Sequence, residues 1–577
     1  MLKHDAAELL QPFVQLPIEE LLRSLELPPK PELGDYAYPC FPLAKQRRQA
    51  PHQIAAEIAT QVNEQGREGV RAEAAGGYVN LFFDPAAQAP KLLDRMLQPD
   101  YGRLQTGAGK RVVIDMSSPN IAKPFGIGHL RSTVIGNALA NLYMQAGYEV
   151  EKVNHLGDWG TQFGKLIAAY KHWGDEEALR RQPIEESLKL YVKFHEEAEQ
   201  QPELEDEARE WFRKLEQGDA ETLALWSYFV DVSMEEFNRV YERLGVQFDH
   251  VLGESFYNDK MGAVVERLTE LDLLEESDGA MVVRLDEDGM PPCLILKSNG
   301  TTIYPTRDLA TAIYRKEVMG ADKLLYVVGA EQQLHFRQVY AVLRKMGYAW
   351  AEDCEHVAFG LMTFNGKKMS TRRGKVVFLD EVLNEAVGKA MAIVEEKNPQ
   401  SPDKKSIAEA IGVGAIVFGD VKNSRMLSVD FQLDEALRFE GETAPYMQYT
   451  YARTLRLLEK GQEMNGTGAQ DGAQDADEAA VAPLQGLHLS GPEAWACVKT
   501  LSLFEETVAA AVQHNEPSLF VRMLLEVAKQ FNRFYHNEPI LVADPEARRA
   551  KLALTAAVSR ILRQGLHTIG IQTPARI

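Results

Sequence analysis

A turn of small residues between an apolar strand and a helix is the first place in this sequence where we expect a phosphate group to bind. Residues Arg111 to Asp115 are rich in valine and isoleucine, which is typical of a buried parallel strand. Apolar residues then recur at helical spacing from His129 to Gly147, so we expect His129 to open a helix. The free N–H groups and the positive dipole end of such a helix attract anions. Gly126 and Gly128 have no side chain to keep a nucleotide from the backbone.

A run of cationic side chains between Phe364 and Lys375 is the second candidate. Its sequence, FNGKKMSTRRGK, places four cations between Gly366 and Gly374 and a fifth directly after them. Such a run is typical of a solvated hairpin, and it is also typical of a mobile basic loop that reaches phosphates. Neither this run nor a short glycine turn assigns a chemistry when it is taken alone.

Together the two segments resemble the HIGH and KMSKS signatures of class I aminoacyl-tRNA synthetases, at His129 and Lys368. Three longer strings narrow the resemblance to arginyl-tRNA synthetases of bacterial type: SSPNIAKP at 117–124, HLGDWGTQFG at 155–164 and FEGETAPY at 439–446. The resemblance implies an arginine–tRNA ligase, which activates L-arginine with ATP, releases pyrophosphate and transfers arginine to the terminal ribose of its tRNA. It also implies that activation depends on tRNA.

The order of expected elements predicts an α/β protein with a split Rossmann-like parallel sheet as its catalytic core. With the resemblance, we expect three domains: an N-terminal α/β module at 1–105 that contacts tRNA, a class I catalytic domain at 106–430, and an all-α helix bundle at 431–577 that binds the anticodon. A charge-rich helical region is inserted in the catalytic domain at about 170–295. The Gly, Asp and Gln-rich segment from Gly461 to Gln485 predicts a flexible loop.

Arginine activation joins a carboxylate to the α-phosphorus of ATP and needs no nucleophile from the enzyme. The protein has to align the two groups and neutralise charge that develops on phosphoryl oxygens. On this basis and by resemblance, the expected catalytic residues are Lys123, His129, Lys368, Ser370 and Arg372. The expected ATP-binding residues are Pro124, Gly126, Gly128, His129, Lys368 and Met369.

Two positions depart from the class I signatures and remove potential phosphate contacts. Gly126 replaces the first histidine of HIGH, and Thr371 replaces the second lysine of KMSKS. Lys123 lies on the same turn as Gly126, and it is our preferred replacement cation. Arg372 and Arg373 flank the changed loop position and are the alternatives, although arginine and lysine offer different donor geometries.

Specificity for arginine requires carboxylates, because a buried guanidinium without a partner is unfavourable and its planar fork matches a carboxylate. Asp115 and Asp308 are the obvious pair. A four-residue spacing places Tyr304 and Asp308 on one face of a helix. A structural alternative for Asp308 is a helix N-cap or an ion pair with Arg307.

The resemblance divides the arginine-binding residues between the two ends of the substrate. It implies that Asp115 and Asn120 hold the amino end, and that Tyr304, Asp308 and Gln332 line the guanidinium pocket. We also expect the loop at 155–164 to shape the adenosine and amino-acid pocket through His155, Asp158, Trp159 and Gln162. The full arginine-binding set is Asp115, Ser117, Asn120, His155, Tyr304, Asp308 and Gln332.

The two helical stretches Ala444 to Lys460 and Leu519 to His536 interleave aromatic and basic residues. Aromatic packing inside a helix bundle explains most of such rings. Exposed members of the set can instead stack on unpaired bases, since RNA is commonly held on aromatic faces and arginine planes. The expected tRNA-binding residues are Tyr446, Tyr449, Arg453, Arg456 and Arg533.

Composition sets further limits. The formal charge of −21 disfavours general nucleic-acid binding, but a local basic stripe can still bind tRNA. The four cysteines are isolated, so we read them as core residues and expect no zinc and no organic cofactor, only ATP as a substrate with Mg²⁺. With no apolar run of membrane length and no leader pattern at Met1, we expect a cytoplasmic protein without membrane contact. We also expect a monomer.

Two other functions fit parts of the pattern. A small adenylyltransferase uses a similar turn before a helix, but it needs neither the basic run nor a large helical C-terminal domain. A catalytically silent relative could hold tRNA or arginine as a sensor, and the changes at Gly126 and Thr371 keep that alternative open.

Overall fold

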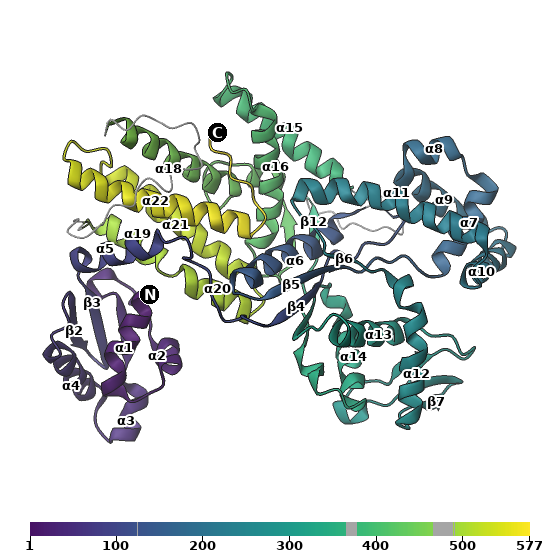
Figure 1. Ribbon diagram of the computed structural model, residues 1–577, viewed down its shortest axis with the longest axis horizontal. Coiled ribbons are helices and arrows are strands. Elements are labelled where there is room, and N and C mark those ends of the chain that lie inside the picture. Colours follow the sequence, from purple (N-terminus) through teal and green to yellow (C-terminus); the bar gives the residue numbers. More distant parts are fainter. Residues whose placement is uncertain (124, 365–377, 465–488, 490) are drawn as a thin grey trace.

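The computed structural model describes residues 1–123, 125–364, 378–464, 489 and 491–577. Figure 1 shows a central parallel sheet, with the helices α7 to α11 extending to one side and the C-terminal helices on the other. The N-terminal module lies at the end of the C-terminal helices. Lys499 and Trp495 of that bundle both donate to the Asp35 carboxylate, at 2.7 Å and 3.2 Å, and so tie the two ends of the chain together.

The N-terminal module is a small antiparallel sheet covered by helices. Its strand order is β1-β3-β2, with β1 at Tyr36–Pro39, β2 at Val70–Ala75 and β3 at Tyr78–Phe83. Strand β3 ends two residues before Pro85, and the longest helix of the module begins at Pro51. The helices are α1 (Leu2–Val14), α2 (Ile18–Ser24), α3 (Phe41–Arg47), α4 (Pro51–Glu64) and α5 (Pro85–Met96), with a 3₁₀ turn η1 at Pro31–Leu33.

The core sheet has five parallel strands in the order β11-β10-β4-β5-β6. The chain builds β4, β5 and β6 in one direction and then returns to add β10 and β11 on the other side of β4. The sheet therefore has its topological switch point between β4 and β10, where ligands of such folds bind at the carboxyl ends. The strands are β4 (Arg111–Asp115), β5 (Glu149–Asn154), β6 (His250–Val251), β10 (Lys323–Tyr326) and β11 (Cys354–His356).

Helices cover both faces of this sheet. Alternate residues of β4 point to opposite faces, so each face contributes side chains to a different hydrophobic core. Val112 and Ile114 join a hydrophobic core shared with α6 (Ile127–Gln145), whereas Val113 joins a second core shared with α13 (Tyr304–Glu317) and α14 (Gln333–Lys345). Each of these helices starts near the carboxyl edge of the sheet. The near-continuous apolar pattern of β4 follows from this two-sided burial.

The expected insertion is interrupted by a strand of the core sheet. Five helices come first, and the chain then returns to pair β6 with β5 before it leaves the core again. The second excursion contains an antiparallel sheet in the order β7-β8-β9, so the region expected to be helical is mixed. Its elements are α7 (Thr161–Trp173), α8 (Glu176–Arg181), α9 (Pro183–Ala198), α10 (Glu203–Glu216), α11 (Ala220–Leu244), η2 (Glu254–Lys260), α12 (Met261–Glu270), β7 (Glu275–Ser277), β8 (Ala280–Val283), η3 (Asp286–Asp288) and β9 (Cys293–Leu296).

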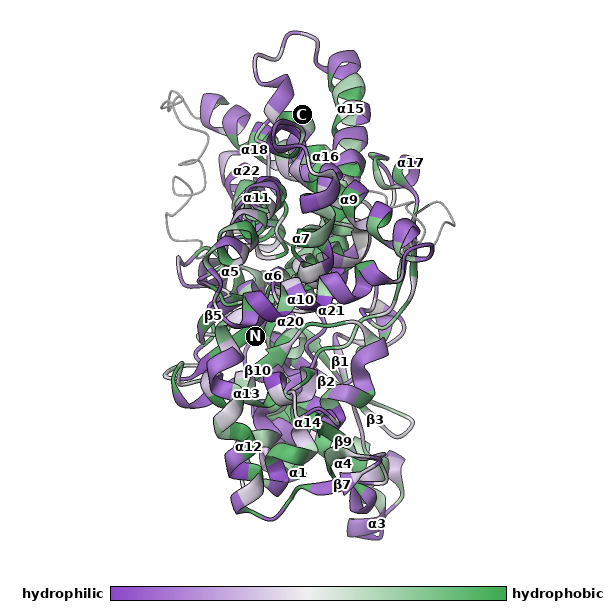
Figure 2. Cartoon of the chain, turned by 90° about the vertical axis from the view of Figure 1, so that its right-hand side faces the viewer, coloured by the Kyte–Doolittle hydropathy of each residue, from purple (hydrophilic) through white to green (hydrophobic). Residues whose placement is uncertain are grey.

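After the core the chain is almost wholly helical. A short parallel pair links β12 (Met362–Phe364) to β13 (Val429–Phe431). In α15, apolar residues recur at helical spacing and are buried, and Figure 2 shows both hydrophobic and hydrophilic colours along this helix. The remaining elements are η4 (Ala330–Gln332), η5 (Ala349–Asp353), α15 (Leu379–Lys397), α16 (Lys404–Val421), α17 (Leu433–Ala436), α18 (Ala444–Met464), α19 (Pro492–Leu501), α20 (Phe504–Gln513), α21 (Pro517–Asn537) and α22 (Pro545–Thr568).

The start of the predicted flexible loop at Gly461 is wrong. Helix α18 continues through Gly461 to Met464, because Gly461 is buried where a Cβ would lie 2.5 Å from a methyl group of Leu552 on α22. Glycine serves here as a close-packing residue and not as a helix end. The rest of the predicted loop, 465–485, lies outside the described residues.

A buried ion pair braces the sheet against the helical half of the molecule. Arg131 on α6 donates from Nε to Asp420 on α16 at 2.9 Å, and both side chains are almost fully buried. Nη1 of Arg131 also donates to the carbonyls of Gly360 and Leu427, at 2.7 Å and 2.9 Å. Because these residues precede β12 and β13, Arg131 ties the first turns of α6 to the strand pair that flanks the basic segment. Burial nevertheless raises the pKa of Asp420 to about 6.

Candidate active site

The amino end of α6 is the turn where phosphate binding is predicted. The helix begins at Ile127, two residues before His129, so the predicted helix start is confirmed to within its first turn. The Gly126 N–H donates to His129 Nδ1 at 3.3 Å, and the His129 N–H donates to the Gly126 carbonyl at 3.0 Å. Among the described residues, no atom lies within 4 Å of the position that a Cβ at Gly128 would take, so none of them covers this side of the turn.

His129 is held as a neutral imidazole at this turn. Burial, together with the nearby Lys123 charge, lowers the pKa of His129 to about 4. The Nδ1 atom accepts the Gly126 N–H, so the single ring proton of the neutral form is on Nε2. His129 can therefore donate one hydrogen bond to a phosphoryl oxygen without carrying charge itself.

Lys123 supplies the positive charge beside His129. Its ammonium group lies 3.4 Å from Gln162 Oε1 and 5.7 Å from the centre of the Tyr191 ring. Burial lowers the pKa of Lys123. Among the described residues no carboxylate forms an ion pair with Lys123, which leaves its charge available to an anionic ligand.

The basic segment itself lies outside the described residues, as do Pro124, Lys368, Met369, Ser370 and Arg372. Its two flanks are described, and they decide where it is attached. Phe378 forms an antiparallel bridge with Gly126, and the Leu379 N–H donates to the Phe125 carbonyl at 2.9 Å. The chain that follows the basic segment, from Phe378 on, is therefore fastened to the turn that carries His129, although the two are about 250 residues apart in the sequence.

Asp115 ends β4 at the same edge of the sheet. Its carboxylate accepts from Ser118 Oγ at 2.8 Å and from Arg315 Nη1 at 2.7 Å. Asn120 bridges to Gly157 in the loop after β5. His155 opens that loop, and its Nδ1 is buried without a partner in the described chain. The structure thus brings Asp115, Asn120 and His155 together where β4 and β5 end.

Asp308 faces the site from the second sheet face. It lies on α13, and one carboxylate oxygen is 2.5 Å from His335 Nε2 on α14. The N-cap of α13 is Ile303, and Arg307 pairs with Glu254 at 3.3 Å. Both structural alternatives for Asp308 are therefore wrong.

Tyr304 and Gln332 lie at the amino ends of the two helices. Tyr304 is the first residue of α13, one turn before Asp308, and 64% of its surface is exposed. Gln332 precedes α14 and is also exposed. Both residues lie on α13 four residues apart, so they share one face of that helix, as predicted.

Three family models match most of the chain in three successive parts. Residues 92–433 match the family of class I tRNA synthetases (R), catalytic domain; residues 447–577 match the DALR anticodon binding domain; and residues 1–83 match the arginyl tRNA synthetase N terminal domain. The arginine–tRNA ligase of Clostridium perfringens is 48% identical over 572 residues, covering 99% of this chain and 98% of the relative. Arginine–tRNA ligase 2 of Bacillus anthracis is 47% identical over 562 residues, covering 97% and 96%.

The chain belongs to the arginyl-tRNA synthetase family. The solved arginyl-tRNA synthetase of Thermus thermophilus has a TM-score of 0.81 at 28% identity, with both chains fully covered. That of Plasmodium falciparum has a TM-score of 0.80 at 21% identity, with 100% and 99% covered, which supports the fold alone. The predicted family, the α/β fold class and the assignment to class I aminoacyl-tRNA synthetases are confirmed, and a small adenylyltransferase is excluded.

As an arginyl-tRNA synthetase, the chain is an enzyme with arginine, ATP and tRNA as its reaction partners. Within the described residues, no helix has both the length and the hydropathy that a membrane crossing needs. The four cysteines are buried and free, as expected for core residues.

Ser117 has a buried hydroxyl that forms hydrogen bonds within the protein. Its side chain is 3% exposed, and Ser117 Oγ lies 2.8 Å from Tyr241 Oη while it accepts from Thr133 Oγ1 at 2.8 Å. Ser117 and Ser118 both have left-handed backbone conformations, with φ of 72° and 51°. Such conformations cost free energy outside glycine, so this network holds a strained turn in place.

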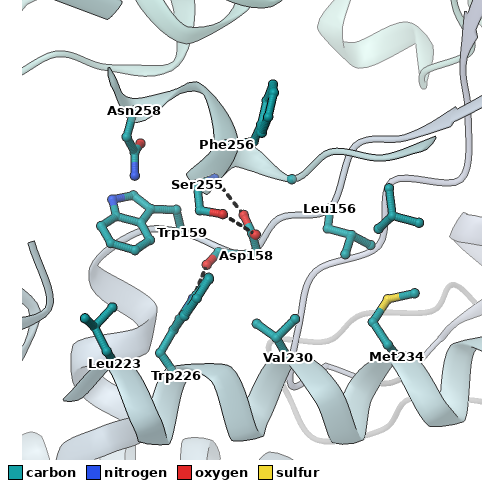
Figure 3. Close-up of a pocket in the computed structure, with 12 residues that line it drawn as sticks. Leu156, Asp158, Trp159, Leu223, Trp226, Val230, Met234, Ser255, Phe256 and Asn258 are labelled. Atoms are coloured by element: carbon teal, nitrogen blue, oxygen red, sulfur yellow. Dashed lines mark hydrogen bonds between the residues drawn. The ribbon is translucent and has the colours of Figure 1, made fainter. Parts of the chain in front are cut away.

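Asp158 and Trp159 line a hollow beside the loop that follows β5. As Figure 3 shows, the Asp158 carboxylate accepts from the Ser255 N–H at 2.8 Å and from Ser255 Oγ at 2.6 Å, while Trp226 Nε1 donates to the Asp158 carbonyl at 2.7 Å. The cavity between these residues and α11 is largely apolar and measures about 500 Å³. Asp158 therefore fastens the loop after β5 to η2.

The C-terminal bundle separates its aromatic rings into core and surface. Tyr451, Phe531 and Phe534 are buried and pack inside the bundle. Tyr449 and Tyr535 are 40% and 37% exposed, and the Arg453 guanidinium lies 5.0 Å and 4.8 Å from their ring centres.

Of the other residues predicted to bind tRNA, Arg456 and Arg533 are exposed on the same two helices. Tyr446 is half-buried and accepts from Asn532 Nδ2 at 2.9 Å. These helices, α18 and α21, therefore carry one exposed surface of the predicted composition.

Sequence reasoning missed three residues that hold the site in shape. Arg315 lies seven residues after Asp308, two turns along the same helix, and that spacing is a signal that was available. His335 and Tyr241 come from helices whose packing no local pattern reveals. None of the three is itself marked by a signature string.

We predict that Asp308→Asn weakens arginine binding by about 2–5 kcal/mol, since the change removes one partner of a charge pair but keeps its shape. Citrulline, which is uncharged, should lose much less. Calorimetry with both ligands measures the difference. His335→Gln is the matched control, because it removes the imidazole that contacts Asp308 within the protein and leaves the Asp308 carboxylate in place. Equal losses for arginine and citrulline would mean that Asp308 is structural.

Proposed function

We propose that the carboxyl edge of the sheet holds arginine and ATP side by side and performs arginine activation there. The main observation behind this proposal is the bridge between Gly126 and Phe378, because it fastens the chain directly after the basic segment to the turn of His129. Asp115 and Asp308 face the same edge from β4 and α13. Cations for a triphosphate and carboxylates for the two positively charged ends of arginine are thereby adjacent, as an in-line reaction between two bound substrates requires.

In the ATP site, His129 and Lys123 have different roles. His129 Nε2–H donates to a phosphoryl oxygen, and Lys123 supplies the charge that Gly126 and Thr371 no longer provide. We assign the predicted basic-segment residues Lys368, Met369, Ser370 and Arg372 to the same phosphates. ATP enters with Mg²⁺ as part of the substrate, since Mg²⁺ in such sites is bound largely by phosphate oxygens. The carboxylate of arginine then attacks the α-phosphorus and pyrophosphate leaves.

On the arginine side, we assign Asp115 and Asn120 to the amino group, with His155 beside them. Asp308, Tyr304 and Gln332 line the guanidinium pocket. The Asp308–His335 contact supports this assignment, because it fixes the carboxylate at the mouth of α13 and α14. Ser117 acts by holding the strained turn between the two substrates.

We assign tRNA to the two outer domains. Tyr449, Arg453 and Tyr535 form a surface on which unpaired anticodon bases can stack, with Arg456, Arg533 and Tyr446 around it. The module at 1–105 adds a second contact. We also propose that the enzyme acts in the cytoplasm as a monomer.

We predict that pyrophosphate exchange with arginine and ATP requires tRNA. The signatures lack two cations, and docking of tRNA on both sides of the core would complete the site. The assay measures exchange with no tRNA, with tRNA for arginine and with a non-cognate tRNA. Exchange that is equally fast without tRNA would refute the coupling. No exchange or charging under any condition would favour a silent arginine or tRNA sensor.

We predict that Lys123→Ala lowers kcat of adenylate formation by about two to three orders of magnitude, with a smaller change in the KM for ATP. Lys368→Ala should also be impaired, and the two losses should not add if both cations stabilise the same charge. Single-turnover kinetics measure both variants and the double variant. The Lys123 assignment fails if folded Lys123→Ala forms adenylate at the wild-type rate, and Arg372 and Arg373 then become the candidates.

A further inference from the structure

A buried arginine holds the carboxylate that we assign to the amino group of the substrate. Arg315 lies near the end of α13, and its side chain is only 1% exposed. Its Nη1 donates to Asp115 Oδ2 at 2.7 Å, across the boundary between α13 and β4. The pair spans the topological switch point, where α13 feeds into β10 and β10 lies directly beside β4.

The other oxygen of Asp115 is also held. Ser118 Oγ donates to Asp115 Oδ1 at 2.8 Å, from the strained turn that follows β4. Hydrogen bonds at both oxygens fix the plane of the carboxylate. Each oxygen has two lone pairs, so each keeps the capacity to accept one further hydrogen bond from a ligand.

Among the described residues, Arg315 has no second ion-pair partner. Its Nε and Nη2 are buried and have no hydrogen-bond partner in the described chain. The guanidinium lies 5.3 Å from the centre of the Tyr326 ring and close to the Tyr257 hydroxyl, neither of which is a carboxylate. Asp308, seven residues earlier on α13, is held by His335 instead. Among the described residues, Asp115 is therefore the one carboxylate that Arg315 pairs with.

The free-energy cost of burying Arg315 with two unpaired nitrogen atoms indicates that the orientation of the Asp115 carboxylate matters. A guanidinium that leaves two N–H-bearing atoms without partners is a poor contributor to stability, because desolvation offsets much of the attraction to Asp115. A hydrophobic side chain of similar volume would pack more favourably on α13. What the arginine provides, and a hydrophobic residue does not, is a fixed direction for the Asp115 carboxylate.

We propose that Arg315 is a positioning residue for recognition of the α-amino group of arginine, and that it acts by orienting Asp115. This inference rests on the role of Asp115 in the proposed function. Arg315 does not touch the substrate. It fixes Oδ2, Ser118 fixes Oδ1, and the remaining lone pairs face the ammonium group of the amino acid.

The test compares L-arginine with des-amino-arginine, which keeps the guanidinium and the carboxylate but lacks the α-amino group. Arg315→Met should weaken arginine binding by at least about tenfold, the loss expected for one misdirected charged hydrogen bond. The affinity for des-amino-arginine should change by less than about twofold on the same scale. Calorimetry in the presence of tRNA gives both values. Equal losses for the two ligands, or no loss for arginine, would overturn the inference.

Control variants keep the outcomes apart. Lys316→Met removes the neighbouring cation, which lies 3.7 Å from Asp353 outside the site, and should leave both ligands unaffected. If Asp115→Asn does not discriminate between the ligands, the proposed role of Asp115 is wrong. If Asp115→Asn discriminates and Arg315→Met does not, only the present inference is wrong. Should Arg315→Met fail to fold, Arg315→Lys is judged by the same comparison, since it keeps the charge but loses the planar fork.

Discussion

The position of β4 between β5 and β10 is the constraint on which the rest of this structure depends. From β4 the chain first adds β5 and β6 on one side, and it later adds β10 and β11 on the other side. Because all five strands are parallel, the loops after β4, β5 and β10 lie at one edge of the sheet. The turn of His129, the loop of His155 and the approach to Gln332 meet there for that reason alone. If β10 paired at the other end of the sheet, Asp308 and Asp115 would face different clefts.

Long-range anchors then convert this topology into a site. The Gly126–Phe378 bridge brings the far half of the chain to the helix that carries His129, and Arg131 ties the same helix to Gly360 and Leu427. Removal of one partner from a buried pair such as Arg131 and Asp420 typically costs about 3–5 kcal/mol, because the remaining charge stays buried. The catalytic geometry is thus maintained by contacts that lie behind the reacting groups.

Local sequence patterns were sufficient to predict the helices and strands with clear periodicity. They were insufficient to predict the contacts between those elements. β4, α6 and the common face of Tyr304 and Asp308 follow from periodicity, and the family follows from three long strings. β6 was missed because two residues carry no period, and α18 was ended too early because Gly461 contacts Leu552 from a distant helix.

Pairs such as Asp308 with His335 join helices whose relative placement no sequence window contains. For the same reason, no pattern distinguished Phe531, which is buried, from Tyr535, which is exposed. The packing of α11 against the loop of Asp158 and Trp159 is likewise absent from any sequence window.

The most direct measurement of the central claim is a crystal structure of the enzyme with tRNA and a non-hydrolysable analogue of arginyl-adenylate. The account predicts that His129 Nε2 and Lys123 Nζ lie within hydrogen-bond distance of the phosphate mimic. It also predicts that the guanidinium contacts Asp308 while the amino group contacts Asp115. A phosphate mimic bound away from the α6 turn, or a guanidinium without contact to Asp308, would contradict it.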